Sequence, residues 1–159
     1  MTGSDSLSST ANLTLTITSP YATWQGTKFT SPDIATGLTT LTSDFDHDGM
    51  ANLLEYAFGR NPKAADAHGI VPNVSGNKLQ ISFACDSSRT DITYTVQASS
   101  TLAPNSWTDI AKSVGGAATV PINSLSTVSD SGSGLRTVTV TEAATLAGKR
   151  FLRVKVTSP

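Results

Sequence analysis

Four carboxylates fall within one twelve-residue segment, from Asp44 to Glu55, and this crowding constrains the fold more than any other feature of the 159-residue chain. Carboxylates this close together repel one another unless a cation lies among them. The segment matches every specified position of the calcium-loop pattern D-x-[DN]-x-[DN]-G-x5-E. The alternative is an acidic turn that only caps a helix, but a chance match in a chain this long has odds of roughly one in a few thousand. The segment therefore predicts a metal site.

The residue type at each position suits Ca²⁺, which takes six to eight oxygen ligands at about 2.3–2.6 Å. Alternating aspartates can turn three carboxylates inward on a curled backbone, and Gly49 permits the sharp bend that follows them. The side chain of Met50 remains free to pack elsewhere, because only its backbone oxygen is needed. The predicted ligands are Asp44, Asp46, Asp48, the carbonyl of Met50, Asn52 through a water molecule, and both carboxylate oxygens of Glu55.

Calcium fits this ligand set better than magnesium or zinc. Mg²⁺ demands a rigid octahedron and keeps several waters, whereas a bidentate Glu55 suits the larger and more flexible Ca²⁺. Zn²⁺ prefers nitrogen and sulfur ligands. The nearest nitrogen ligand, His47, falls at a loop position that points outward. We therefore expect Ca²⁺ as the cofactor.

One helix is expected to leave the loop and none to enter it. Residues 37–43 are poor helix formers. Residues 52–58 carry apolar side chains at helical spacing, and Gly59 is suited to a left-handed helix end. Calcium sensors open a groove between paired helices, and a single loop lacks that arrangement. The pattern favours a fixed structural ion.

The loop with one exiting helix resembles the calcium loops of thrombospondin type 3 repeats and dockerins, which are EF-hand-like. Over residues 44–62 it is similar to a segment near the C-termini of large secreted proteins of environmental bacteria. Residues 94–102 and 150–154 resemble the β-rich part of the same proteins more loosely. The resemblance implies an extracellular accessory module with calcium ligands at the positions named above. Dockerins carry two loops in tandem, so their docking function is not implied for this chain.

After about residue 70, apolar residues recur at every second position, which is the period of a half-buried strand. Six or so short strands separated by turn residues predict an antiparallel β-sandwich, either immunoglobulin/fibronectin-like or jelly-roll. The clearest strands are expected at residues 79–83, 92–96, 138–140 and 152–156, with weaker ones at 107–110 and 120–122.

The predicted fold is therefore mainly β, with a small helical segment before the sandwich. Residues 1–11 are Ser/Thr-rich and read as a disordered tail or linker. Residues 12–66 contain a predicted strand at 12–18 and the helical calcium-binding segment. The first helix is expected to start at Ser19-Pro20, and Pro32 and Gly37 limit a second helix to about two turns. Residues 67–159 are expected to form the sandwich.

Charge and composition narrow the function. The net charge is −1 and 14% of residues are charged, so the chain lacks the basic stripe that nucleic acid requires. No apolar run is long enough to span a bilayer. Cys85 is the only cysteine, which leaves a metal as the alternative to a disulfide. The polar start suggests a piece of a longer exported chain, and with the resemblance we expect a secreted or cell-surface bacterial protein.

A non-catalytic accessory module is the function these observations favour, with calcium in a structural role and other domains of the parent protein as neighbours. No Ser-His-Asp arrangement and no phosphate-binding glycine loop is recognisable, so enzyme activity is not expected. A carbohydrate-binding module and a protein-docking or cell-surface attachment module remain alternatives. Sugar binding would need exposed aromatic faces. Core packing is the expected role of Tyr21, Trp24, Tyr56, Trp107 and the small apolar Cys85.

Overall fold

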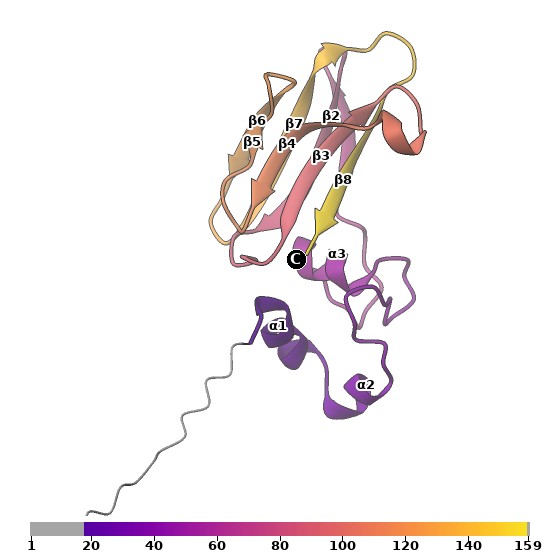
Figure 1. Cartoon of the computed structure of the whole chain (residues 1–159), viewed down its shortest axis with the longest axis vertical. Coiled ribbons are helices and arrows are strands. Elements are labelled where there is room, and N and C mark those ends of the chain that lie inside the picture. The colour runs from indigo at the N-terminus through magenta and orange to yellow at the C-terminus, as the bar shows by residue number, and fades with distance from the viewer. Residues whose placement is uncertain (1–17, 159) are drawn as a thin grey trace, which may run out of the picture.

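The computed structural model describes residues 18–158, and the expectations for residues 1–17 lie outside this range. Two four-stranded antiparallel sheets face each other, and three short helices gather at one end of them (Figure 1). The mainly β fold class is thereby confirmed, and the paired sheets are consistent with the predicted sandwich.

The sheets have the strand orders β1-β2-β7-β6 and β5-β4-β3-β8. Every pair of neighbouring strands is antiparallel. The strands are β1 (Val71–Ser75), β2 (Lys78–Asp86), β3 (Thr93–Ser99), β4 (Thr108–Val114), β5 (Val120–Pro121), β6 (Ser126–Ser131), β7 (Leu135–Thr145) and β8 (Phe151–Thr157).

Alternation along the central strands builds the core between the sheets. On β2, Ile81 and Phe83 pair with Val140 and Val138 of β7, and all four side chains are buried. Tyr94 of β3 approaches from the second sheet and stacks on Phe83 with ring centroids 6.1 Å apart. All six predicted strand positions lie in or beside observed strands, so the sequence pattern located these strands correctly.

Strands β1 and β6 were not predicted. Every residue of β1 is exposed, so its sequence has no apolar alternation, and Pro72 further weakens the signal. Strand β6 is rich in serine, and its buried Ser126 donates its hydroxyl to the carbonyl of Ile110 at 2.6 Å. Strand β1 is held by its hydrogen bonds to β2, and β6 by its hydrogen bonds to β7. A local sequence pattern does not reveal such pairing.

The helices are α1 (Pro20–Lys28), α2 (Ser31–Ala35) and α3 (Asn52–Phe58), with one 3₁₀ turn, η1 (Pro104–Ser106). Ser19 caps α1 by accepting a hydrogen bond from the backbone of Ala22 at 3.1 Å. Gly59 ends α3 in the left-handed conformation, at φ 66°. The predicted start of α1, the short α2 and the whole of α3 are confirmed.

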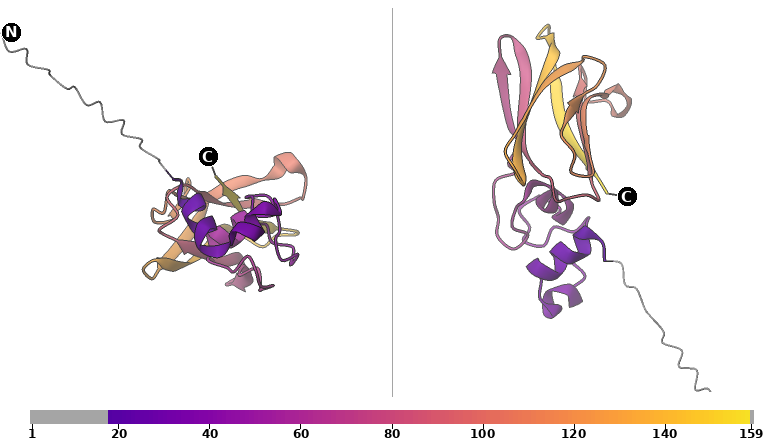
Figure 2. Two further views of the ribbon diagram at one scale, coloured as in Figure 1. Left: turned by 90° about the horizontal axis from the view of Figure 1, so that it is seen from below. Right: turned by 90° about the vertical axis from the view of Figure 1, so that its left-hand side faces the viewer.

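The helices pack against the loops at the lower end of the sheets (Figure 2). The carboxylate of Asp91, between β2 and β3, accepts hydrogen bonds from the Tyr56 hydroxyl at 2.6 Å and from the backbone of Tyr21 at 3.0 Å. Phe58 of α3 reaches into the sandwich, where its ring lies 6.3 Å from that of Phe83. The helical segment and the sheets therefore share one core.

The aromatic residues of the helical segment are core residues, as predicted. Tyr21, Trp24 and Tyr56 are buried and form a cluster with ring centroids 5.3 Å apart. Trp107 is half-buried, and the guanidinium of Arg153 lies over its ring at 4.0 Å. Cys85 is fully buried, which confirms its expected role as a small apolar side chain.

Candidate metal centre

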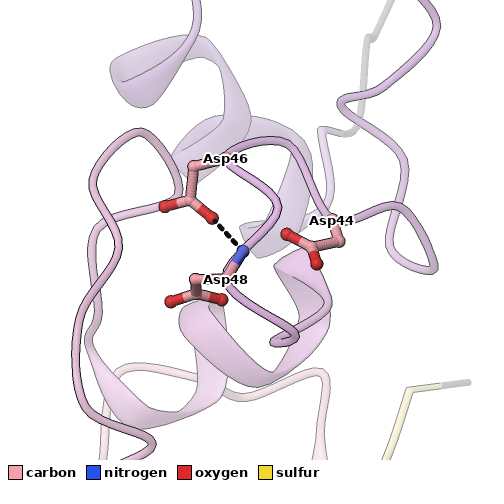
Figure 3. Close-up of side chains that lie close together, drawn as sticks. All are labelled: Asp44, Asp46 and Asp48. Carbon is pink, nitrogen blue, oxygen red and sulfur yellow. Dashed lines mark hydrogen bonds between the residues drawn. The ribbon is translucent and has the colours of Figure 1, made fainter.

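The loop between α2 and α3 brings three aspartates together (Figure 3). Asp44, Asp46 and Asp48 each offer one carboxylate oxygen, and these three oxygens lie within 4.8 Å of one another. The loop residues before α3 form only turns and bends, so no helix enters the loop, as predicted. The curled backbone therefore places the alternating carboxylates on one side.

Hydrogen bonds from the loop's own backbone hold this curl. The two oxygens of Asp44 accept from the amides of His47 and Gly49 at 2.8 and 2.9 Å. Asp48 accepts from the amide of Met50 at 2.8 Å. Asp46 accepts from the amide of Asp48 at 3.3 Å, the bond drawn in Figure 3. Each aspartate therefore fixes the turn that follows it.

Two loop residues have left-handed backbone conformations. Gly49 has φ 92°, and a side chain there would be strained even though a Cβ would meet no atom within 4 Å. His47 has φ 64°, and its side chain is exposed, as predicted. The need for glycine at position 49 is therefore a matter of backbone geometry and not of space.

Glu55 is the most unusual group of the site. It lies in the first turn of α3, is 0% exposed, and neither carboxylate oxygen has a hydrogen-bond partner within residues 18–158. Burial, followed by the charges of Asp46, Asp48, Asp66 and Asp44, raises the pKa of Glu55 to about 8. A buried carboxylate without a donor is costly. A hard cation among these oxygens would remove that cost, so the donor set fits Ca²⁺.

Asp46 shares this environment. One of its oxygens, Oδ2, is buried and has no partner among the described residues. Burial is the largest cause that raises the pKa of Asp46, and the charges of Asp48 and Asp44 add to it. Glu55 and Asp46 thus both have carboxylate oxygens without a hydrogen-bond partner in the described part of the chain.

Met50 and Asn52 differ in how they serve the site. The Met50 side chain is 1% exposed and lies in the core, as expected if only its carbonyl faces an ion. The Asn52 side chain is fully buried and donates its amide nitrogen to the carbonyls of Leu38 and Thr40, at 2.9 and 2.8 Å. Asn52 therefore ties the entering segment to α3, a structural task that the loop pattern did not predict.

One further carboxylate approaches the loop from the connector between α3 and β1. The backbone amide of Asp66 donates to Oδ2 of Asp48 at 3.1 Å, although the two residues are eighteen positions apart in the sequence. Asp66 was not among the predicted site residues. The available signal was that it is the only acidic residue between Glu55 and Asp86.

His68 is exposed, as expected, but it lies near the loop. Backbone hydrogen bonds from Asp66 and Met50 lower the pKa of Asp48, and the charge of His68 lowers it further. Cys85 is on β2, where a guanidinium nitrogen of Arg136 lies 3.4 Å from its sulfur. Burial is the largest influence on the pKa of the Cys85 thiol and raises it, which opposes thiolate formation.

No protein family, curated protein or solved structure matches this chain. Within residues 18–158, no helix is long and apolar enough to cross a membrane. The case for a function therefore depends on the geometry and chemistry of the acidic loop.

Proposed function

We propose that this chain is a non-catalytic accessory module of a secreted multidomain protein and that it binds one calcium ion in the loop from Asp44 to Glu55. The observation that carries the proposal is the buried carboxylate of Glu55, which has no hydrogen-bond donor among the described residues and is acted on by the charges of three loop aspartates. The loop matches the calcium pattern, and its oxygen-only donor set is the one that Ca²⁺ prefers.

The ion would have a structural role. It would link the acidic loop to α3, which packs on the sandwich through Phe58 and Tyr56. Binding to the folded state alone would add about 2.7 kcal/mol at calcium a hundredfold above the dissociation constant. Extracellular modules function with dissociation constants near 10⁻⁴–10⁻³ M, so even a weak site suits a secreted protein.

Isothermal titration calorimetry tests this proposal. Calcium added to metal-free protein should bind one ion per chain, and magnesium should bind more weakly. Asp46→Asn should weaken binding, whereas Asp109→Asn, a matched change of an exposed aspartate on β4, should not. The proposal would be refuted if the injection heats were no larger than the heat of diluting calcium into buffer and elemental analysis found no calcium in the protein.

We also propose that the sandwich is immunoglobulin-like and not a jelly roll. If strands β1 to β8 are lettered A, B, C, C′, C″, D, E and F in chain order, the two sheets have the strand orders A-B-E-D and C″-C′-C-F. This is the strand order of a variable-type immunoglobulin domain without its last strand, G. An experimental structure with β8 hydrogen-bonded to β1 instead of β3 would contradict this assignment.

The carbohydrate-binding alternative has less support. It requires an exposed row of aromatic rings, and within residues 18–158 every aromatic side chain is buried or half-buried. Trp107 is the best remaining candidate, but Arg153 covers one face of its ring. Retardation by soluble or insoluble polysaccharides that is lost in Trp107→Ala would revive this alternative.

A further inference from the structure

We infer that Asp66 supplies an additional oxygen ligand to the calcium ion, so that the ion binds the α3–β1 connector as well as the acidic loop. This inference rests on the proposed calcium site. It extends the site beyond the twelve-residue pattern, to a residue eleven positions after Glu55.

The loop leaves a coordination position to fill. Three aspartate oxygens, the Met50 carbonyl and two oxygens of Glu55 give six ligands, the lower end of the six to eight that Ca²⁺ takes. The pattern would add a water held by Asn52. The amide nitrogen of Asn52 donates to two carbonyls of the entering segment, and its Oδ1, the atom that would hold such a water, is buried and has no hydrogen-bond partner among the described residues. With that water the count is seven, so one further protein oxygen stays within the range that Ca²⁺ takes.

Asp66 is held beside the site by its own backbone. Its amide donates to Oδ2 of Asp48, a predicted ligand, at 3.1 Å. Its Oδ2 accepts a bond from the amide of Asn61 at 3.3 Å, which closes the turn of the connector. Its Oδ1 is buried and has no hydrogen-bond partner among the described residues. One carboxylate oxygen of Asp66 is therefore fixed near the loop and remains unsatisfied.

An ion pair with Arg60 is the ordinary explanation for such a carboxylate. The Nε of Arg60 lies 3.9 Å from Oδ1 of Asp66, which is too long for a hydrogen bond, and this Nε also has no partner among the described residues. Both side chains are about one-third exposed, at 32% and 31%. Ion pairs of this kind contribute little. Arg60 therefore does not account for the buried oxygen of Asp66, whereas a cation in the loop does.

Terbium luminescence tests the inference on the full chain. Tb³⁺ is a luminescent substitute for Ca²⁺, and its decay rates in H₂O and D₂O report the number of water molecules on the ion. If Asp66 is a ligand, Asp66→Ala should add about one water to the bound ion, because water replaces the lost oxygen. Asp109→Ala, the control on β4, should add none. Calcium affinity should also fall in Asp66→Ala, by an order of magnitude or more, since even outer-shell partners change affinity about 10- to 100-fold.

An unchanged number of bound waters in Asp66→Ala would overturn the inference, even if its affinity falls, because loss of a nearby charge weakens binding without opening a ligand position. Asp66→Asn, which retains the shape of the side chain, provides a second affinity measurement if the alanine variant folds poorly. An affinity equal to that of the unsubstituted chain would also overturn the inference. If the unsubstituted chain binds neither Ca²⁺ nor Tb³⁺, the calcium site itself is refuted.

Discussion

Two buried glutamates, one in each part of the molecule, are treated in opposite ways. Glu142 on β7 is 3% exposed and forms an ion pair with Arg150, whose Nε donates to its Oε2 at 3.3 Å. Glu55 on α3 is 0% exposed, and within residues 18–158 neither of its oxygens has a donor. The sandwich neutralises its buried carboxylate with a side chain, whereas the charged groups found to act on Glu55 within the described part of the chain are themselves carboxylates.

This difference indicates which part of the molecule needs something from outside. A buried charge without a partner is expensive, and a protein usually supplies the partner or raises the pKa of the group. The helical segment does the second when no cation is present. The account therefore predicts that the helical segment responds to calcium and pH, and that the sandwich does so only through the core that the two parts share.

Withdrawal of calcium should have the largest effect on stability. At calcium a hundredfold above the dissociation constant, the loss is about 2.7 kcal/mol. For a chain of this size, that corresponds to a fall in melting temperature of about 5–10 °C. Calorimetric melting in calcium and then in EDTA measures it. Equal melting temperatures in calcium and in EDTA, at a calcium concentration that saturates the site, would contradict the claim that Glu55, unlike Glu142, needs a cation.

In EDTA, stability should decrease as pH rises from 5 to 8. Folding raises the pKa of Glu55 from 4.5 to about 8. Between these values the folded state retains a proton that the unfolded chain has lost, so rising pH favours unfolding. The melting temperature should fall by several degrees, and Glu55→Gln should flatten this part of the profile. A profile unchanged by Glu55→Gln would show that another group controls it.

Glu142→Gln should destabilise the chain by about 1–3 kcal/mol, because it leaves Arg150 without its carboxylate. The loss should be the same in calcium and in EDTA. Glu55→Gln should instead abolish the response to calcium and slightly stabilise the metal-free chain at neutral pH, because unfolding then no longer releases the proton that Glu55 holds in the folded state. Chemical denaturation of both variants in both buffers measures the four values. A loss for Glu142→Gln that depends on calcium would contradict the separation of the two parts.

Gly49→Ala should have the smallest effect, a loss of about 1 kcal/mol, because φ 92° strains any residue with a Cβ. Gly26→Ala is the matched control. Gly26 lies within α1 without a positive φ, a Cβ there meets no atom within 4 Å, and alanine favours a helix. Calcium affinity should fall only in Gly49→Ala. Equal affinities in the two variants would show that the bend at Gly49 is not needed for binding.

The parts of the fold that could be predicted are those whose signal is local. Alternation located β2, β3, β7 and β8, and a capping serine and a terminal glycine located α1 and the end of α3. Strands β1 and β6 could not be found in this way, because pairing with β2 and β7 holds them in place and their sequences have no apolar alternation.

The same distinction holds at the candidate site. The curled aspartate loop follows from residues two to five positions apart, so its geometry could be predicted. The backbone bond from Asp66 to Asp48 and the bonds from Asn52 to residues 38 and 40 depend on how distant segments meet. That Glu55 finds no donor among residues 18–158 is also a property of the folded environment. Spacing identified the candidate ligands, but only the folded chain shows which oxygens are unsatisfied.

An X-ray structure of the full chain grown in CaCl₂, with anomalous scattering measured, tests the central claim most directly. The account predicts one anomalous peak in the loop, about 2.3–2.6 Å from oxygens of Asp44, Asp46, Asp48 and Glu55. A well-ordered loop with no such peak, and with Glu55 hydrogen-bonded to a protein donor, would contradict it.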